Sequence, residues 1–276
     1  MLRYFGFFGN GYEGSWGSAL EATAPYGNLN WLDYQDSGFK DKLAYTHQQG
    51  KRAIVSIGKM LYSYPSVRPL PGRADQFTSW WNDLAELQAT IVGFLIADEP
   101  WRTNEKNNLG LSSSQVTWYL NEAATEIKGI VASSGSYLPP AIVVSASGGE
   151  YDSYKIPVAV DWLGMYRYSY NTHWTVLMFS FINLIRKKEG NQKIVAIADA
   201  FEWPNKTIDE VRIIGMNQTW RMLISWYPSH VIAVAPFLYQ TSSMGFGASS
   251  MPRVLADISA WSQELTVGVA AWDQSS

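Results

Sequence analysis

The sequence predicts a single α/β domain over residues 1–276, folded as a (β/α)₈ TIM barrel. Eight short apolar segments recur along the chain, and helical patterns or loops separate them. Several segments are rich in Val and Ile without strict polar–apolar alternation, as in parallel strands buried on both faces. Eight alternating strand–helix units have the size of such a barrel, and no Pro/Gly/Ser-rich linker divides the chain.

The predicted strands follow in chain order. They are 3–9, 29–34, 52–58, 91–97, 141–147, 160–166, 193–199 and 230–239. The third and seventh are the clearest, because each contains an uninterrupted run of small and β-branched residues. An open, doubly wound sheet is the alternative, and it is disfavoured because no glycine-rich phosphate-binding loop follows the first strand.

Helical patterns fill most of the gaps between these strands. We expect helices over 39–49, 76–87, 112–130, 175–185 and 207–226, and from residue 250 onward. Ser112 with Gln115, and Thr207 with Glu210, have the spacing of capping boxes, and Pro252 suits the first turn of the last helix. The helices after the first, second and fifth strands are the least distinct.

The composition excludes several functional classes. The chain has no cysteine, so disulfides, zinc-thiolate sites and cysteine nucleophiles are excluded. The formal net charge is −3, and no basic patch supports nucleic-acid binding. The three histidines are scattered along the chain and do not have the spacing of a metal site. We expect no cofactor, because proton transfer by side chains does not need one.

The sequence bears only weakly on compartment and assembly. No apolar run reaches the roughly 18 residues that a membrane-spanning helix needs, and no signal-peptide pattern precedes the first strand. We expect an extracellular protein if a leader has been removed, and a cytoplasmic one otherwise. Nothing in the sequence indicates the oligomeric state.

Aromatic residues are numerous, with 13 Trp, 16 Tyr and 11 Phe. Some must belong to the core. Trp and Tyr also combine an apolar ring with a hydrogen-bonding group, which suits them to stacking on sugar rings. Because several tryptophans flank strand ends, we expect a carbohydrate partner.

Acidic residues gather after the predicted strands, where parallel α/β folds bind their ligands. They are Asp33, Asp36, Asp98, Glu99, Asp199 and Glu202. The fourth strand ends in Asp98-Glu99-Pro100-Trp101, and the proline cannot continue the sheet. Two carboxyl groups across a cleft are what glycoside hydrolysis requires, one to protonate the leaving oxygen and one to attack or to activate water.

At these residues the chain resembles the clan A glycoside hydrolases, (β/α)₈ retaining enzymes with catalytic carboxylates on strands four and seven. Strand four of that clan ends in Asn-Glu-Pro or a near variant, and Asp98-Glu99-Pro100 stands in the matching place. The resemblance implies that Glu99 is the acid/base, and that Asp199 or Glu202 is the nucleophile or base of a poly- or oligosaccharide hydrolase.

Three departures from the clan pattern affect the expected mechanism. Asp98 replaces an asparagine that contacts the sugar 2-hydroxyl, and an ionised aspartate accepts hydrogen bonds without donating them. Asp199 is in register but one methylene short, whereas Glu202 is the right type but lies three residues later. A wider gap between carboxyls favours inversion, so retention and inversion both stay open.

The remaining candidate residues are aromatic or basic and lie near the same rim. The resemblance implies that Tyr166 or Tyr168 supports the nucleophile, and that Phe237 or Tyr239 replaces a platform tryptophan. Arg167 is able to hold a carboxylate or an acidic sugar, and Trp101, Trp203 and His173 complete an expected subsite wall with Asp98. Some candidates also have a structural alternative. Asp199 can cap a helix or pair with Arg167, and Tyr166 and Tyr168 can be packed aromatics.

Two other functions remain as alternatives. A barrel that binds carbohydrate without cleaving it would keep the aromatic cleft. A lyase or aldolase would use Lys59, after the third strand, as a Schiff-base amine if it is desolvated. The glycine- and serine-rich segment 242–250 lies where barrels often bind phosphate, but it contains no basic residue.

Overall fold

The computed structural model describes residues 2–8, 16–135, 139–167, 173–237 and 246–270. In these residues eight parallel strands form one barrel-like sheet, so the predicted (β/α)₈ fold is confirmed. The strands are β1 (Tyr4–Phe5), β2 (Leu29–Asp33), β3 (Arg52–Ser56), β4 (Ile91–Asp98), β5 (Ala141–Ser147), β6 (Trp162–Tyr166), β7 (Lys193–Ile197) and β9 (Val231–Val234).

The sheet runs in the order β1-β9-β7-β6-β5-β4-β3-β2. Between β2 and β1 the side chain of Asn28 bridges the strands: its amide donates to the Arg3 carbonyl, and its Oδ1 accepts the Phe5 N–H at 2.9 Å. A Cβ at Gly6 would lie 1.7 Å from the Leu29 carbonyl oxygen. Only glycine lets the two strands approach this closely.

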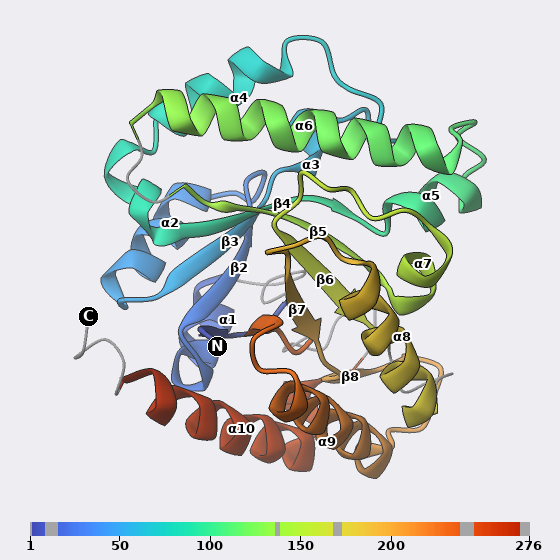
Figure 1. Ribbon diagram of the computed structural model, residues 1–276. Coiled ribbons are helices and arrows are strands. Elements are labelled where there is room, and N and C mark those ends of the chain that lie inside the picture. Colours follow the sequence, from blue (N-terminus) through green and yellow to red (C-terminus); the bar gives the residue numbers. More distant parts are fainter. Residues whose placement is uncertain (1, 9–15, 136–138, 168–172, 238–245, 271–276) are drawn as a thin grey trace.

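Helices surround this barrel (Figure 1), with α4 and α6 along one side and α9 and α10 along the opposite side. The α-helices are α1 (Trp16–Thr23), α2 (Phe39–Gln48), α3 (Gly58–Leu61), α4 (Arg73–Asn82), α5 (Pro100–Lys106), α6 (Ser113–Ser133), α7 (Gly148–Ser153), α8 (Trp174–Lys187), α9 (Glu210–Trp226) and α10 (Pro252–Ala270). Short 3₁₀ helices are η1 (Ala24–Tyr26), η2 (Ala85–Thr90) and η4 (Ala248–Ser250), and β8 (Phe201–Glu202) pairs with β10 (Phe246–Gly247) in a small antiparallel ribbon.

The helix starts follow their caps. Ser112 accepts the Gln115 N–H and Gln115 accepts the Ser112 N–H, so the predicted capping box of α6 is confirmed. The prediction for α9 was wrong at its start, because Asp209 rather than Thr207 is the N-cap and accepts the Arg212 N–H. An aspartate directly before the first turn caps the helix without a glutamate three residues later.

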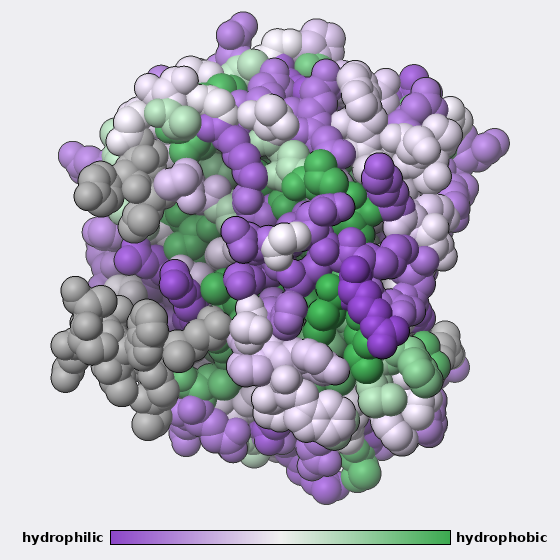
Figure 2. Space-filling model, in the orientation of Figure 1, coloured by the Kyte–Doolittle hydropathy of each residue, from purple (hydrophilic) through white to green (hydrophobic). Residues whose placement is uncertain are grey.

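Buried side chains form two layers. One fills the barrel and includes Trp31, Ile54 and Val195, and the other lies between the strands and the helices. Hydrophobic residues form separate patches among hydrophilic ones on the face shown in Figure 2. Among the described helices, none is both long enough and apolar enough to span a bilayer.

Candidate active site

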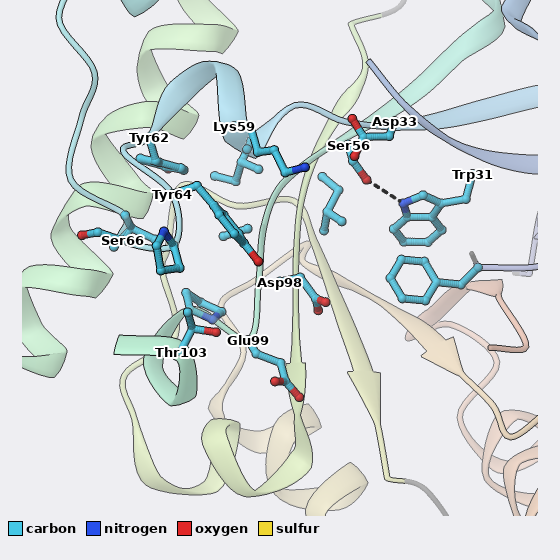
Figure 3. A pocket seen from close by; sticks show the side chains of 18 of the residues that line it. Trp31, Asp33, Ser56, Lys59, Tyr62, Tyr64, Ser66, Asp98, Glu99 and Thr103 are labelled. Carbon is cyan, nitrogen blue, oxygen red and sulfur yellow. Dashed lines mark hydrogen bonds between the residues drawn. The ribbon is translucent and has the colours of Figure 1, made fainter. Parts of the chain in front are cut away.

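A cavity of about 560 Å³ opens at the carboxyl ends of the first four strands (Figure 3). Its floor includes Phe8 after β1, Trp31 on β2 and Leu95 on β4. Its walls come from the ends of β2, β3 and β4 and from segment 58–67. The volume lies within the roughly 300–1,000 Å³ of small-molecule sites, at the rim where barrel enzymes act.

The end of β4 brings two carboxyl groups to the cavity. Asp98 is the last residue of the strand, and Glu99 is the N-cap of α5 with a left-handed φ of 46°. A non-glycine residue in that conformation is uncommon and marks a sharp change of direction. The turn aims Glu99 at the cavity edge, where its carboxylate is paired with Arg102 Nη1 at 2.7 Å.

Asp98 has an altered proton affinity. Its carboxyl faces the open cavity but is ringed by protein, and this desolvation raises its pKa from 3.8 to about 7. The Ser145 hydroxyl donates to Asp98 Oδ1, and this hydrogen bond lowers the pKa of Asp98. The charges of Glu99 and Glu150 raise that pKa further. The Asp98 carboxyl therefore keeps its proton to a higher pH than an ordinary aspartate does.

The wall opposite β4 carries two more acids with basic partners. Burial raises the pKa of Asp33, while the Gln35 N–H at 2.9 Å and the nearby Lys59 ammonium lower it. Figure 3 shows the Lys59 amine directed toward Asp33 and Ser56. Asp36 is ion-paired with Lys42 at 2.6 Å. This side of the cavity therefore presents polar groups that are already held in place.

Aromatic rings supply the apolar surface of the cavity. Trp31 donates its Nε1–H to the Ser56 hydroxyl at 3.2 Å, which fixes the indole, and its ring lies 4.3 Å from that of Phe8. Tyr64 is 71% exposed, and its hydroxyl end points toward the β4 end that bears Asp98 (Figure 3). These rings offer both a floor and an exposed edge for stacking.

The acids expected on the seventh strand are buried. Asp199 is 1% exposed, and its backbone N–H and carbonyl both bond the Asn217 side chain. Glu202 is also 1% exposed; its Oε2 binds Arg212 and its Oε1 accepts the Trp203 N–H at 3.1 Å. Neither belongs to the described lining of the cavity.

Two further candidates have structural partners. Trp101 is 1% exposed, its Nε1–H donates to the Thr117 hydroxyl at 3.2 Å, and its ring stacks on Tyr154. It therefore faces the core beneath α5, which does not fit the expected contact with substrate. Arg167 donates to the Ser180 hydroxyl at 3.0 Å and is paired with Asp152. These contacts connect the end of β6 with α7 and α8, and they differ from the expected pairing of Arg167 with Asp199.

The other aromatic candidates lie elsewhere on the rim. Tyr166 and Phe237 are buried in the barrel interior, and Phe237 contacts the rings of Phe8 and Phe201. Trp203 is 37% exposed beside Phe201. His173 caps α8 through the Thr175 N–H and is exposed. Tyr168 and Tyr239 lie outside the described residues.

Several cavity residues were absent from the predicted site. They are Phe8, Trp31, Tyr64 and, behind Asp98, Ser145. Phe8 follows the first strand, so the rule that located the acids could also have located it. Trp31 lies in the middle of β2 and Tyr64 lies beyond α3, so that rule does not find them. Nothing in the sequence pairs Ser145 with Asp98, because that contact depends on the register of β4 and β5.

No metal site emerges from the described residues, where no group of three or more His, Asp or Glu side chains is placed to hold an ion. The polar side chains in the described lining of the cavity include carboxyl groups, hydroxyls and the lysine Lys59. Such a set can donate and accept protons and can bind a polyhydroxylated ligand.

Comparison with solved structures supports the fold. Xylanase 10B of Thermotoga maritima matches with a TM-score of 0.61 over 95% of this chain and 96% of its own, at 9% identity. The chain has the fold of the clan A glycoside hydrolases. A β-1,3-glucanosyltransferase of Rhizomucor miehei, solved as an active-site mutant with laminaritriose, matches at a TM-score of 0.58 and 12% identity, over 89% and 92% of the two chains.

A β-glucosidase from Exiguobacterium marinum gives a TM-score of 0.56 at 9% identity, over 85% of this chain and 80% of its own. No protein-family model and no curated protein sequence matches the chain. At these identities the resemblance establishes the shared barrel alone.

Proposed function

We propose that the protein is a glycoside hydrolase that cleaves a poly- or oligosaccharide, with Glu99 as the acid/base. The observation that carries this proposal is the pair Asp98–Glu99 at the carboxyl end of β4, in a cavity with an aromatic floor. Protonation of the leaving oxygen requires a carboxyl group beside the ligand, and the position of Glu99 in the cavity lining supports this role.

The comparisons favour carbohydrate as the substrate class. The structures with the same barrel include a xylanase, a β-glucosidase, a β-1,3-glucanosyltransferase and two fungal β-1,4-galactanases. β-Linked glycans are therefore the first substrates to test. The resemblance to the clan assigns the second carboxyl to Asp199 or Glu202, and both side chains are buried outside the described lining of the cavity.

Release of reducing sugar from β-1,3-glucan, xylan, galactan and chitin oligosaccharides tests the proposal. Glu99→Gln keeps the size of the side chain but replaces the acid with an amide that cannot protonate the leaving oxygen. It should therefore lower turnover about 100-fold or more while the glycan still binds. Glu105→Gln, an exposed acid on the same helix, is the matched control and should retain wild-type activity. Wild-type protein that cleaves none of these glycans would contradict the proposal.

A carbohydrate-binding barrel without catalysis is the second candidate. The burial of both seventh-strand acids favours it, since a hydrolase of the clan A type needs one of them at the substrate. Such a protein would bind the glycan equally well with Glu99 or Gln at this position. The lyase or aldolase alternative gains no support, because Lys59 is exposed at the cavity rather than enclosed by apolar side chains.

A further inference from the structure

The two carboxyl groups at the end of β4 belong to one wall of the cavity. Asp98 and Glu99 are consecutive, so their Cα atoms are about 3.8 Å apart, and both line the cavity. In the two-carboxylate mechanisms the groups flank the sugar from opposite sides, about 5–5.5 Å apart for retention and about 6.5–9.5 Å apart for inversion. Two carboxyls that come from one strand end belong to one side of the cavity, whereas these mechanisms need a carboxyl on each side of the sugar.

The other acids near the rim are either buried or held beside a lysine. Asp199 and Glu202 are each 1% exposed. Asp36 is paired with Lys42, and Asp33 accepts the Gln35 N–H beside Lys59. Glu99 is itself paired with Arg102 at 2.7 Å, but it directly follows Asp98, so among the described residues these two acids are the adjacent pair that can act on one side of a ligand in the cavity.

We infer that the substrate itself supplies the nucleophile, as the 2-acetamido group of a β-linked N-acetylhexosamine, and that Asp98 supports this group while Glu99 is the acid/base. The inference rests on the proposed hydrolase function and specifies its substrate class. It assigns the two neighbouring acids to two different jobs on one wall, so that no carboxylate is needed across the cavity.

The acetamido carbonyl oxygen attacks the anomeric carbon, the glycosidic C–O bond breaks, and Glu99 gives its proton to the leaving oxygen. The resulting oxazolinium ion is positively charged, and its N–H donates to Asp98. Water then attacks the anomeric carbon, Glu99 takes a proton from that water, and the ring opens to the acetamido sugar with net retention.

The surroundings of Asp98 suit this role. The Ser145 hydroxyl holds Oδ1, and the carboxyl remains open to the cavity. An anionic Asp98 is destabilised by its neighbours Glu99 and Glu150, so a cation that forms beside it is stabilised. The apolar side chains of Trp31 and Leu95 line the same cavity and can receive the acetamido methyl group.

Two 4-nitrophenyl β-glycosides that differ only at carbon 2 test the inference. The 2-acetamido glucoside should be cleaved at least about 100-fold faster than the 2-hydroxyl glucoside, with retained configuration in the product. With wild-type enzyme the rate should fall at each step from acetamido to mono-, di- and trifluoroacetamido substrates, because fluorine weakens the carbonyl oxygen as a nucleophile. This series needs no variant, and so it is independent of folding defects.

Asp98→Asn should lower kcat/KM for the acetamido substrate about 100-fold, the usual effect of removing one electrostatic stabiliser of a transition state. Asp75→Asn, an exposed aspartate on α4, should have no effect. A thermal melt of each variant checks that the loss comes from chemistry rather than unfolding.

The outcomes separate the inference from the hydrolase proposal. Cleavage of 2-hydroxyl glycosides or neutral glycans in a Glu99-dependent way, without preference for the acetamido group, would overturn the inference and leave the hydrolase intact. An inverted product that is lost in Asp33→Asn would do the same, with Asp33 as the base for water. If no glycoside or glycan is cleaved, the hydrolase proposal fails and the inference fails with it.

Discussion

The hydroxyl of Ser145 on β5 donates to the carboxylate of Asp98 on β4, and the two residues are paired in the strand register. The carbonyl of the same serine accepts the Glu99 N–H at 2.9 Å. One buried serine therefore positions both acids of the cavity wall. This arrangement ties the chemistry of the rim to the register of two neighbouring strands.

Ser145→Ala should raise the pKa of Asp98, because the lost hydrogen bond stabilises the ionised form. If catalysis needs ionised Asp98, kcat/KM of the wild type should rise with pH through an apparent pKa of about 7. In the variant this rise should move to higher pH. Ser133→Ala, an exposed serine on α6, is the control; an unchanged pH profile in Ser145→Ala would show that Asp98 does not set the rise.

Asp98 should also make the stability of the fold depend on pH. Its pKa is about 7 in the folded state against the usual 3.8, so the folded state binds the proton more tightly. The contribution of Asp98 to the free energy of unfolding is therefore highest below pH 4 and falls as the pH rises to about 7. Asp98→Asn should be relatively more stable, compared with wild type, at pH 8 than at pH 5.

Urea denaturation at those two pH values measures the effect. Asp75→Asn serves as the control, because Asp75 is an exposed aspartate on α4 away from the cavity lining. Equal differences between Asp98→Asn and wild type at pH 5 and pH 8 would refute the raised pKa.

Tyr64→Ala should weaken glycan binding without changing stability. The side chain is 71% exposed at the cavity edge, so its loss should change the free energy of unfolding by no more than about 0.5 kcal/mol. Loss of one stacking ring should weaken binding by about 0.5–1.5 kcal/mol, a twofold to tenfold rise in Kd. Calorimetric titration with the glycan measures the Kd. Trp118 is an exposed tryptophan on α6, and the control variant Trp118→Ala should show no such rise.

Trp101→Ala should have the opposite pattern. The indole is 1% exposed and stacks on Tyr154, so its removal leaves a cavity and should cost about 3–5 kcal/mol of stability. Glycan affinity of the protein that remains folded should stay near the wild-type value. A stable Trp101→Ala protein with weakened binding would instead restore this residue to the substrate site.

Glu202→Gln tests whether the second seventh-strand candidate is structural. The buried carboxylate is ion-paired with Arg212, so the substitution should cost about 1.5–3 kcal/mol of stability, as for a hydrogen bond to a charged group. Turnover per folded molecule should change little. Glu189→Gln, an exposed acid after α8, gives the baseline for both measurements, and a loss of turnover above tenfold in Glu202→Gln alone would identify a catalytic carboxylate.

The strands could be predicted because buried parallel strands leave uninterrupted apolar runs, and all eight predicted runs contain an observed strand. The end of β4 could be placed as well, since Pro100 terminates the sheet. The partners of the rim residues could not. Asp98 accepts a hydrogen bond from Ser145, Trp101 donates one to Thr117, and Glu202 is ion-paired with Arg212. Tertiary packing sets each of these contacts, and sequence spacing does not reveal them.

The rate of the Glu99→Gln variant on substrates with different leaving groups shows whether Glu99 is the catalytic acid. The dinitrophenolate of an activated glycoside departs with little need of protonation, whereas the sugar leaving group of an unactivated disaccharide departs only when an acid protonates it. If Glu99 is the acid, the variant should cleave the disaccharide about 100-fold or more slowly than wild type and should lose far less on the activated glycoside. Equal losses on both substrates, or none on either, would contradict the assignment of Glu99 as the catalytic acid.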